Sequence, residues 1–96
     1  MSPFKRKKLA KIRFELDKLD NLLIKVIKKR TNLVKKVLTL KDKKKQIVDK
    51  KRIQTILKNI RKKSLKNNID PRITNRIWKN MIWSYIDFER RNFKKK

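Results

Sequence analysis

The side chains best suited to chemistry in this sequence are cations that interrupt apolar patterns. Arg30 belongs to a seam of residues spaced alternately three and four apart, and every other member of the seam is aliphatic: Leu9, Ile12, Leu16, Leu19, Leu23, Val26, Leu33, Val37 and Leu40. Burying an unpaired guanidinium costs much free energy, so Arg30 requires a carboxylate or a bound anion. With 33 Lys and Arg against 8 Asp and Glu, carboxylates are scarce, which favours an external anion. The alternative is an arginine that sets the helix register or reaches water at the edge of the seam.

Two further cations, Arg13 and Lys41, lie on one flank of the same seam. Lys41 follows Arg30 by about 16 Å of helix at nearly the same azimuth, so the two long side chains could hold one small anion. Arg13 precedes Arg30 by about 25 Å, too far to serve that anion within one chain, although an antiparallel dimer would bring it to the partner's site. The alternative for both is a solvated flanking charge.

Glu89 is one of two glutamates, and it follows Ile82 and Tyr85 at helical spacing. Desolvation favours the protonated form of a carboxyl, nearby cations favour the ionised form, and a protonated carboxyl can donate a hydrogen bond. A surface ion pair is the alternative for Glu89. For Asp49 and Arg52 the ordinary interpretation is a helix N-cap and a charge in the first turn of that helix.

The elements that must position these residues are helices. The seam predicts a first helix from about Pro3 or Leu9 to Lys41, followed by a loop over 42–48. Asp49 is a candidate N-cap for a second helix that ends near residues 66–68. Asp70 followed by proline starts a third helix that runs to about Phe93, and we expect Ile73, Ile77, Met81 and Tyr85 to face inward on it. The first helix spans roughly 50 Å, which exceeds a compact monomer of this length, so a second chain must cover its seam.

Composition excludes several classes of protein. The chain has 96 residues, no Cys, no His and no Gly, which removes disulfides, the usual metal ligands and glycine-rich phosphate loops. We expect one all-α domain over residues 1–96, without metal or cofactor and without a membrane span, in the cytoplasm. The formal net charge of +25 attracts polyanions. A basic nucleic-acid-binding protein is therefore an alternative, but its lysines lie on all outer faces, so such binding would be non-specific.

The order of these residues resembles a known family. The run IRFELDKLDNLLIKVIKKRTNLVKKVLTLK over residues 12–41 is similar to the first helix of the all-helical, AroQ-class (type II) chorismate mutases. That helix carries an arginine, then I/L-D-x-L-D, an apolar run, a second arginine and a terminal lysine. The similarity continues through Asp49, the region of Arg52, and the Ile-Asp-Pro sequence before the third helix.

The resemblance implies an intertwined homodimer with three helices per chain, a long first helix and two shared active sites. The reaction would be the Claisen rearrangement of chorismate to prephenate in aromatic amino-acid biosynthesis. Arg30 would bind one carboxylate of the substrate and Arg13 of the partner subunit the other. Lys41 and Glu89 would donate hydrogen bonds to the ether oxygen. The remaining site residues would border the pocket: Asp49, Arg52 and Tyr85.

This sequence departs from the family pattern at two positions. Ile53 stands where the family usually has the glutamate that holds the ring hydroxyl, and Glu89 stands where many members have glutamine. The first departure resembles isochorismate pyruvate lyase, which shares the fold and yields salicylate, and an inactive family member is a further alternative. Because a glutamate must be protonated to donate, we expect activity to fall as the pH rises and Glu89 loses its proton.

Overall fold

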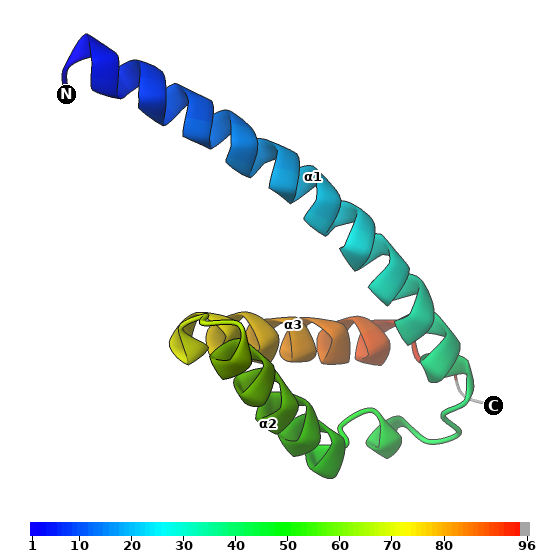
Figure 1. Ribbon diagram of the computed structural model, residues 1–96. Coiled ribbons are helices and arrows are strands. Elements are labelled where there is room, and N and C mark those ends of the chain that lie inside the picture. The colour runs from blue at the N-terminus through cyan, green and yellow to red at the C-terminus, as the bar shows by residue number, and fades with distance from the viewer. Residues whose placement is uncertain (95–96) are drawn as a thin grey trace. The chain divides into compact units, whose positions relative to one another are not determined.

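The computed structural model describes residues 1–94, and Figure 1 shows the order of its elements. Helix α1 spans Pro3–Thr39, a single 3₁₀ turn spans Lys44–Gln46, α2 spans Lys50–Lys66 and α3 spans Pro71–Asn92. No strand occurs among the described residues. The all-α class and the three helices are therefore confirmed. No helix in residues 1–94 combines the length and the apolar character needed to cross a membrane.

The first of two compact units, Met1–Leu33, consists almost entirely of helix α1. The proline of α1 is Pro3, at the first helical position, where an N–H would have no partner within the helix. No residue of α1 is buried, and seam residues such as Leu16, Leu19 and Leu23 remain 53 to 56% exposed. The apolar stripe that the sequence predicts is thus present, and its side chains are accessible along the helix.

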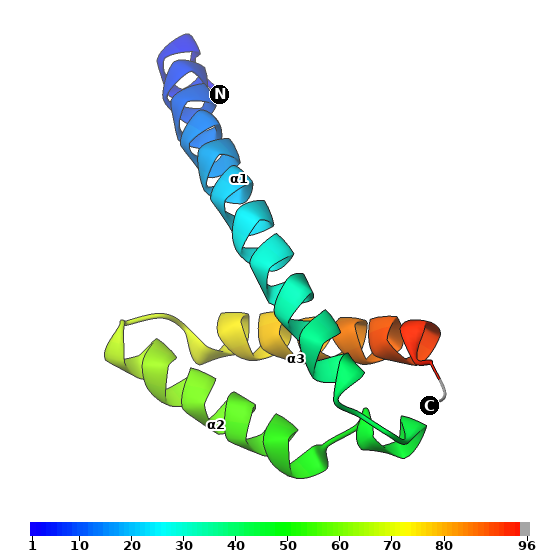
Figure 2. The ribbon, with the colours of Figure 1, turned by 90° about the vertical axis from the view of Figure 1, so that its right-hand side faces the viewer.

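The second unit begins at Val34 and contains the helical hairpin formed by α2 and α3. Both views of the ribbon show the two helices meeting at the turn over residues 67–70 (Figures 1 and 2). Asn68 has φ 56°, the left-handed conformation that asparagine tolerates at a helix end. The amide of Ile69 bonds to the carbonyl of Ser64, and the amide of Asn68 bonds to that of Leu65. This pattern satisfies the last carbonyls of α2 and fixes the reversal of the chain.

Each helix of the hairpin starts at the aspartate that the sequence identified. The carboxylate of Asp49 accepts the amide of Arg52 at 2.9 Å, and that of Asp70 accepts the amide of Arg72 at 2.9 Å. Where α2 and α3 lie close, the hydroxyls of Ser64 and Thr74 are hydrogen-bonded at 2.7 Å. Ser64 is only 3% exposed, so this bond satisfies a polar group that would otherwise be costly to bury.

The core of the second unit is centred on Ile47, Ile82 and Ile86, which are 3, 8 and 5% exposed. Partly buried side chains pack around these three: Leu38, Val48, Ile53, Ile56, Leu57 and Phe93. Ile47 belongs to the segment that the sequence predicts to be a polar loop. Its burial follows from the geometry of the connection, because the side chain of Gln46 accepts the amides of Asp42 and Lys43 and closes the turn beside it.

Two details differ from the sequence-based expectation. Helix α1 ends at Thr39, because the amides of Leu40 and Lys41 bond three residues back, to Val37 and Leu38, and tighten the last turn. Ile73 and Ile77, expected to face inward on α3, are 56 and 51% exposed. The buried face of α3 instead passes through Ile82 and Ile86.

Candidate active site

Lys41 and Glu89 form an ion pair in the second unit. The Lys41 Nζ atom lies 3.1 Å from Glu89 Oε2 and 3.3 Å from Oε1. The side chains are 18 and 7% exposed, respectively. A second ion pair, between Arg91 and Asp87 on α3, has side chains that are 65 and 68% exposed. The Lys41–Glu89 pair is therefore largely shielded from solvent, unlike the pair of Arg91 and Asp87.

The packing of the core explains why these two side chains meet. Lys41 follows the last turn of α1, where its amide bonds to the carbonyl of Leu38. Glu89 lies on α3 one turn beyond Ile86, so the face that buries Ile86 also carries the carboxylate inward. Ile47 packs in the same cluster as Ile86 and joins the connection after Lys41 to α3. The chain thus brings together residues that are 48 positions apart.

The arrangement has the donors that an anionic or ether oxygen would need. An ammonium group carries three N–H donors. Contacts with the two Glu89 oxygens use two of them, which leaves at least one N–H of Lys41 for a ligand. Low exposure also strengthens electrostatic interactions compared with those in water. A carboxyl and an ammonium held this close can act together on one small polar atom.

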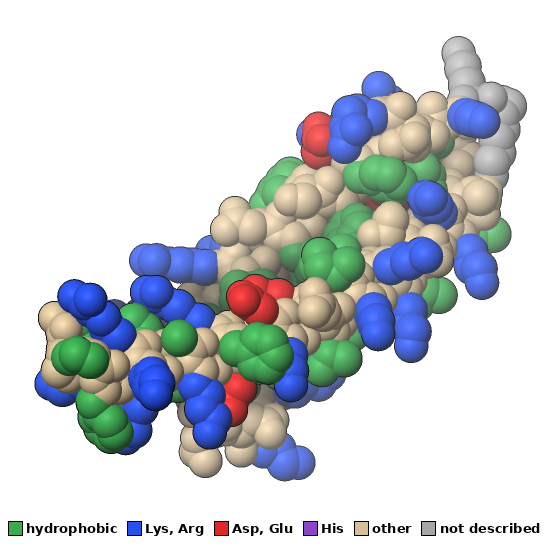
Figure 3. Space-filling view, turned by 90° about the horizontal axis from the view of Figure 1, so that it is seen from above, with side chains coloured by type: hydrophobic (Ala, Val, Ile, Leu, Met, Phe, Trp, Pro, Cys, Tyr) green, Lys and Arg blue, Asp and Glu red, His purple; other side chains and the backbone are tan. Residues whose placement is uncertain are grey.

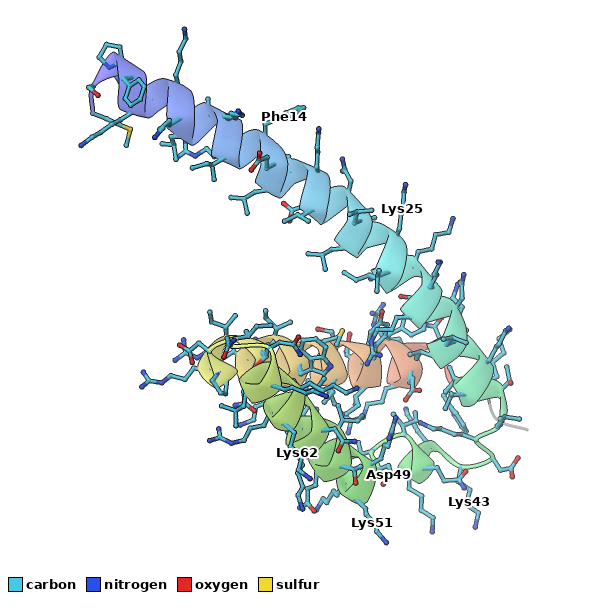
Figure 4. All side chains as sticks on the ribbon, viewed as in Figure 1. Phe14, Lys25, Lys43, Asp49, Lys51 and Lys62 are labelled. Atoms are coloured by element: carbon cyan, nitrogen blue, oxygen red, sulfur yellow. The ribbon has the colours of Figure 1, made fainter. Side chains whose placement is uncertain are left out.

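The other candidate residues of the second unit surround the start of α2 and the face of α3. Asp49 lies at the beginning of α2, as Figure 4 shows, and its carboxylate is engaged in capping that helix. The cap reading of Asp49 is confirmed, whereas its place beside a substrate stays a prediction. Arg52 is exposed, and Tyr85 is half-buried one turn before Glu89.

Ile53 contributes no polar group to this region. Its side chain is half-buried and packs against the cluster of Ile47, Ile82 and Ile86. A carboxylate at this position would replace an apolar contact with that cluster. Ile53 therefore has a packing role in this chain.

The two arginines of the predicted site belong to α1 in the first unit. Arg13 is exposed, and Arg30 is half-buried. Their expected contacts with a substrate stay predictions. No group of three or more Asp and Glu side chains able to hold a metal ion occurs within residues 1–94.

Sequence reasoning missed two residues that hold the site together, Gln46 and Ile47. Both fall in a stretch whose lysines suggest a solvated loop. An available signal was the pair of adjacent aliphatic residues, Ile47 and Val48, between polar neighbours, because such residues seldom stay exposed together. The double hydrogen bond to Gln46 has no comparable signal in the sequence.

Removing both partners of the Lys41–Glu89 pair should destabilise the fold less than the two single removals added together. We expect Glu89→Leu to lower the free energy of unfolding by about 2–4 kcal/mol, because Lys41 loses its counter-charge. The double variant Lys41→Met/Glu89→Leu should cost less than the sum of the single changes, with a coupling of at least about 1 kcal/mol. Urea unfolding at fixed protein concentration measures the cycle.

The exposed pair Arg91–Asp87 provides a matched control on the same helix. Its cycle, built with Arg91→Met and Asp87→Leu, should show a coupling below about 0.5 kcal/mol. Equal coupling in the two cycles would contradict a buried pair at Lys41 and Glu89.

Comparison with known families gives this geometry a context. The family model described as chorismate mutase type II matches residues 12–90. No match was found among curated proteins or among solved structures. The matched range covers most of the chain and includes every candidate site residue from Arg13 to Glu89. The chain therefore belongs to the chorismate mutase type II family.

Proposed function

We propose that this chain converts chorismate to prephenate with Lys41 and Glu89 as the pair that acts on the breaking ether bond. Membership of the chorismate mutase type II family implies an isomerase. The observation that carries the assignment of residues is the buried contact of 3.1 Å between Lys41 and Glu89. It supports the two positions that the resemblance assigns to the ether oxygen.

The chemistry of the reaction suits a site made of fixed polar donors. In the Claisen rearrangement one carbon–oxygen bond breaks while one carbon–carbon bond forms within the same molecule. No group is transferred to the protein, so catalysis depends on folding a flexible dianion into its reactive conformer. Negative charge also develops on the ether oxygen as its bond breaks, and preorganised donors stabilise that charge. The N–H of Lys41 that does not contact Glu89 supplies one such donor. Glu89 would supply a second only in its protonated form, whereas the ion pair with Lys41 is formed by the ionised carboxylate.

The two carboxylates of the substrate require separate cationic partners. Arg30 would bind one of them through the paired N–H groups of its guanidinium, a geometry that matches a carboxylate. Arg13 of the partner subunit would bind the other. Asp49, Arg52 and Tyr85 would complete the wall of the pocket near the substrate ring.

The accessible seam of α1 supports a homodimer in which the sites are shared. Monomeric proteins seldom expose a long contiguous apolar surface. Here the aliphatic seam residues between positions 12 and 37 are 47 to 59% exposed: Ile12, Leu16, Leu19, Leu23, Val26, Leu33 and Val37. A second copy laid along α1 would bury this stripe, as in a helical coiled coil. We place the enzyme in the cytoplasm, within the shikimate pathway to aromatic amino acids.

The lysines do not favour the alternative of a nucleic-acid-binding protein. Figure 3 shows Lys and Arg side chains spread over the visible face instead of gathered in one stripe. A surface of this kind attracts polyanions without a defined footprint.

Turnover should depend on the cations of the site and not on cations in general. We expect Lys41→Ala and Arg30→Ala each to lower kcat/KM for chorismate by about 10²–10³-fold, as for removal of a preorganised donor. Lys43→Ala, an exposed lysine of the same connection (Figure 4), should leave it unchanged. The assay follows prephenate formation.

The same preparation is tested with isochorismate. Salicylate from isochorismate without prephenate from chorismate would assign the lyase reaction instead. If Lys41→Ala and Arg30→Ala both kept their turnover of chorismate, the assignment of Lys41 and Arg30 would be contradicted.

Activity should respond to pH through Glu89. Its carboxyl donates a hydrogen bond only when protonated, so kcat/KM should fall as the pH rises and the proton is lost. Glu89→Gln carries an amide that donates at every pH, so this variant should keep its rate at alkaline pH. Rate profiles of the two proteins from acid to alkaline pH check this, and a flat profile for the unmodified chain would contradict the donor role.

Shared sites predict complementation between two inactive variants. In a heterodimer of Arg13→Ala and Arg30→Ala subunits, one site carries both substitutions and the other carries neither. Random reassociation should therefore restore about one quarter of the unmodified activity, since half the dimers are mixed and each has one intact site. Measured turnover after mixed refolding tests this, with each variant refolded alone as the control. Mixtures no more active than either variant would show that each site lies within one chain.

A further inference from the structure

A hollow of about 440 Å³ lies between α2 and α3 and does not include Lys41 or Glu89. Its volume falls within the range of about 300–1,000 Å³ that small-molecule sites occupy. It is lined near the turn of the hairpin, by residues such as Arg61 on α2 and Asn75 on α3. Asn75 and Glu89 are separated by about 21 Å along α3. The hollow is thus a separate place in the fold.

Three cations line the hollow: Lys58 and Arg61 from α2, and Arg72 from α3. None of the three forms an ion pair with a carboxylate of residues 1–94. The carboxylate adjoining the hollow in sequence is Asp70, and it caps α3 by accepting the amide of Arg72. Even with Asp70 counted, positive charge dominates around the opening.

Part of the lining of the hollow is apolar, and we call Leu57 and Pro71 its apolar floor. Leu57 and Pro71 are half-buried, and Leu57 also packs against the core cluster. Thr74, at the same wall, uses its hydroxyl in the bond to Ser64. An inorganic anion would satisfy the cations but leave the apolar floor uncovered, whereas a ligand with an apolar body would cover both.

We propose that the hollow between α2 and α3 binds a small carboxylate that carries an apolar ring or chain. Its carboxylate contacts Arg61 and Arg72 from opposite walls, and its apolar part lies on Leu57 and Pro71. A guanidinium pairs with a carboxylate through two parallel N–H donors, which gives orientation as well as affinity. The site is independent of the proposed reaction, and binding there requires no turnover of chorismate.

Titration followed by amide NMR, at about 0.15 M salt to screen non-specific attraction, tests the proposal. Benzoate is the probe, with acetate for charge alone and benzyl alcohol for the ring alone. We expect saturable shifts in residues 57–75 with benzoate, and binding at least about tenfold weaker for the other two probes. Equal affinity for acetate and benzoate would overturn the proposal, because the apolar floor would then contribute nothing.

Two double variants of equal charge separate a defined site from general attraction. Arg61→Gln/Arg72→Gln should weaken benzoate binding at least about tenfold. Lys51→Gln/Lys62→Gln removes two exposed lysines of α2 that lie outside the hollow (Figure 4), and should change binding by less than about twofold. Equal weakening in the two variants would overturn the proposal.

A measurement on the unmodified protein makes the test independent of how the variants fold. Nuclear Overhauser contacts between the benzoate ring and the methyl groups of Leu57 are expected. Contacts confined to the region of Lys41 and Glu89, or shifts that never saturate, would show that the hollow is not the binding site.

Discussion

The contact between Lys41 and Glu89 is the interaction on which the second unit of this protein depends. Burying either charge alone would be costly, and burying them together requires that their distance and surroundings be fixed. The positions of the end of α1, of the connection after it and of the inner face of α3 are therefore all constrained by this contact. In a chain with a net charge of +25, carboxylates are few, so the placement of Glu89 on a buried face has a large local effect. The proposed reaction makes use of the same constraint, because donors that are already held need no reorganisation when charge develops.

Small size sets the second constraint. Among residues 1–94 the buried hydrophobic side chains are Ile47, Ile82 and Ile86, whereas a domain of this length normally needs a larger core to be stable alone. Helix α1 meanwhile carries a long accessible apolar stripe. The small core and the accessible stripe both support the proposed association of two chains through α1. The caps at Asp49 and Asp70 and the left-handed Asn68 define the ends of the hairpin helices, and α3 supplies two of the three buried hydrophobic side chains.

Much of the fold followed from local signals that act at one position. The aspartate caps accept backbone amides at the helix starts, the proline at the start of α3 lacks an amide that would need a partner, and the left-handed asparagine after α2 lets the last carbonyls be satisfied. The positions of these residues therefore define the helix boundaries. The seam spacing likewise defined the length of α1 to within a few residues of Thr39. The burial of Ile47 was not predicted, because a residue between helices is buried by packing and does not belong to a periodic pattern in the sequence. Ile73 and Ile77 were misplaced because the helical stripe of α3 is broad, and the sequence does not say which edge faces α2.

For the candidate site, the sequence indicated the individual residues but not the contacts between them. Composition and seam position singled out Arg30, Lys41 and Glu89, but their joint role came from the resemblance, since spacing along a chain gives no contact between helices. The structure adds the direct contact of Lys41 with Glu89. Ile53 shows the limit of the resemblance: the packing of its side chain on the core explains an aliphatic residue there, and it does not distinguish one substrate from another.

The burial of Ile47 restricts the length of the connection between α1 and α2. Loops normally tolerate insertions and deletions because their side chains contact little. Here the deepest apolar side chain of the unit lies in the connection, and Gln46 closes the turn immediately before it. Adding or deleting a single residue would withdraw Ile47 from its contacts and shift Lys41 relative to α3. Changes in the length of this segment should therefore be rarer than substitutions of the lysines that surround it.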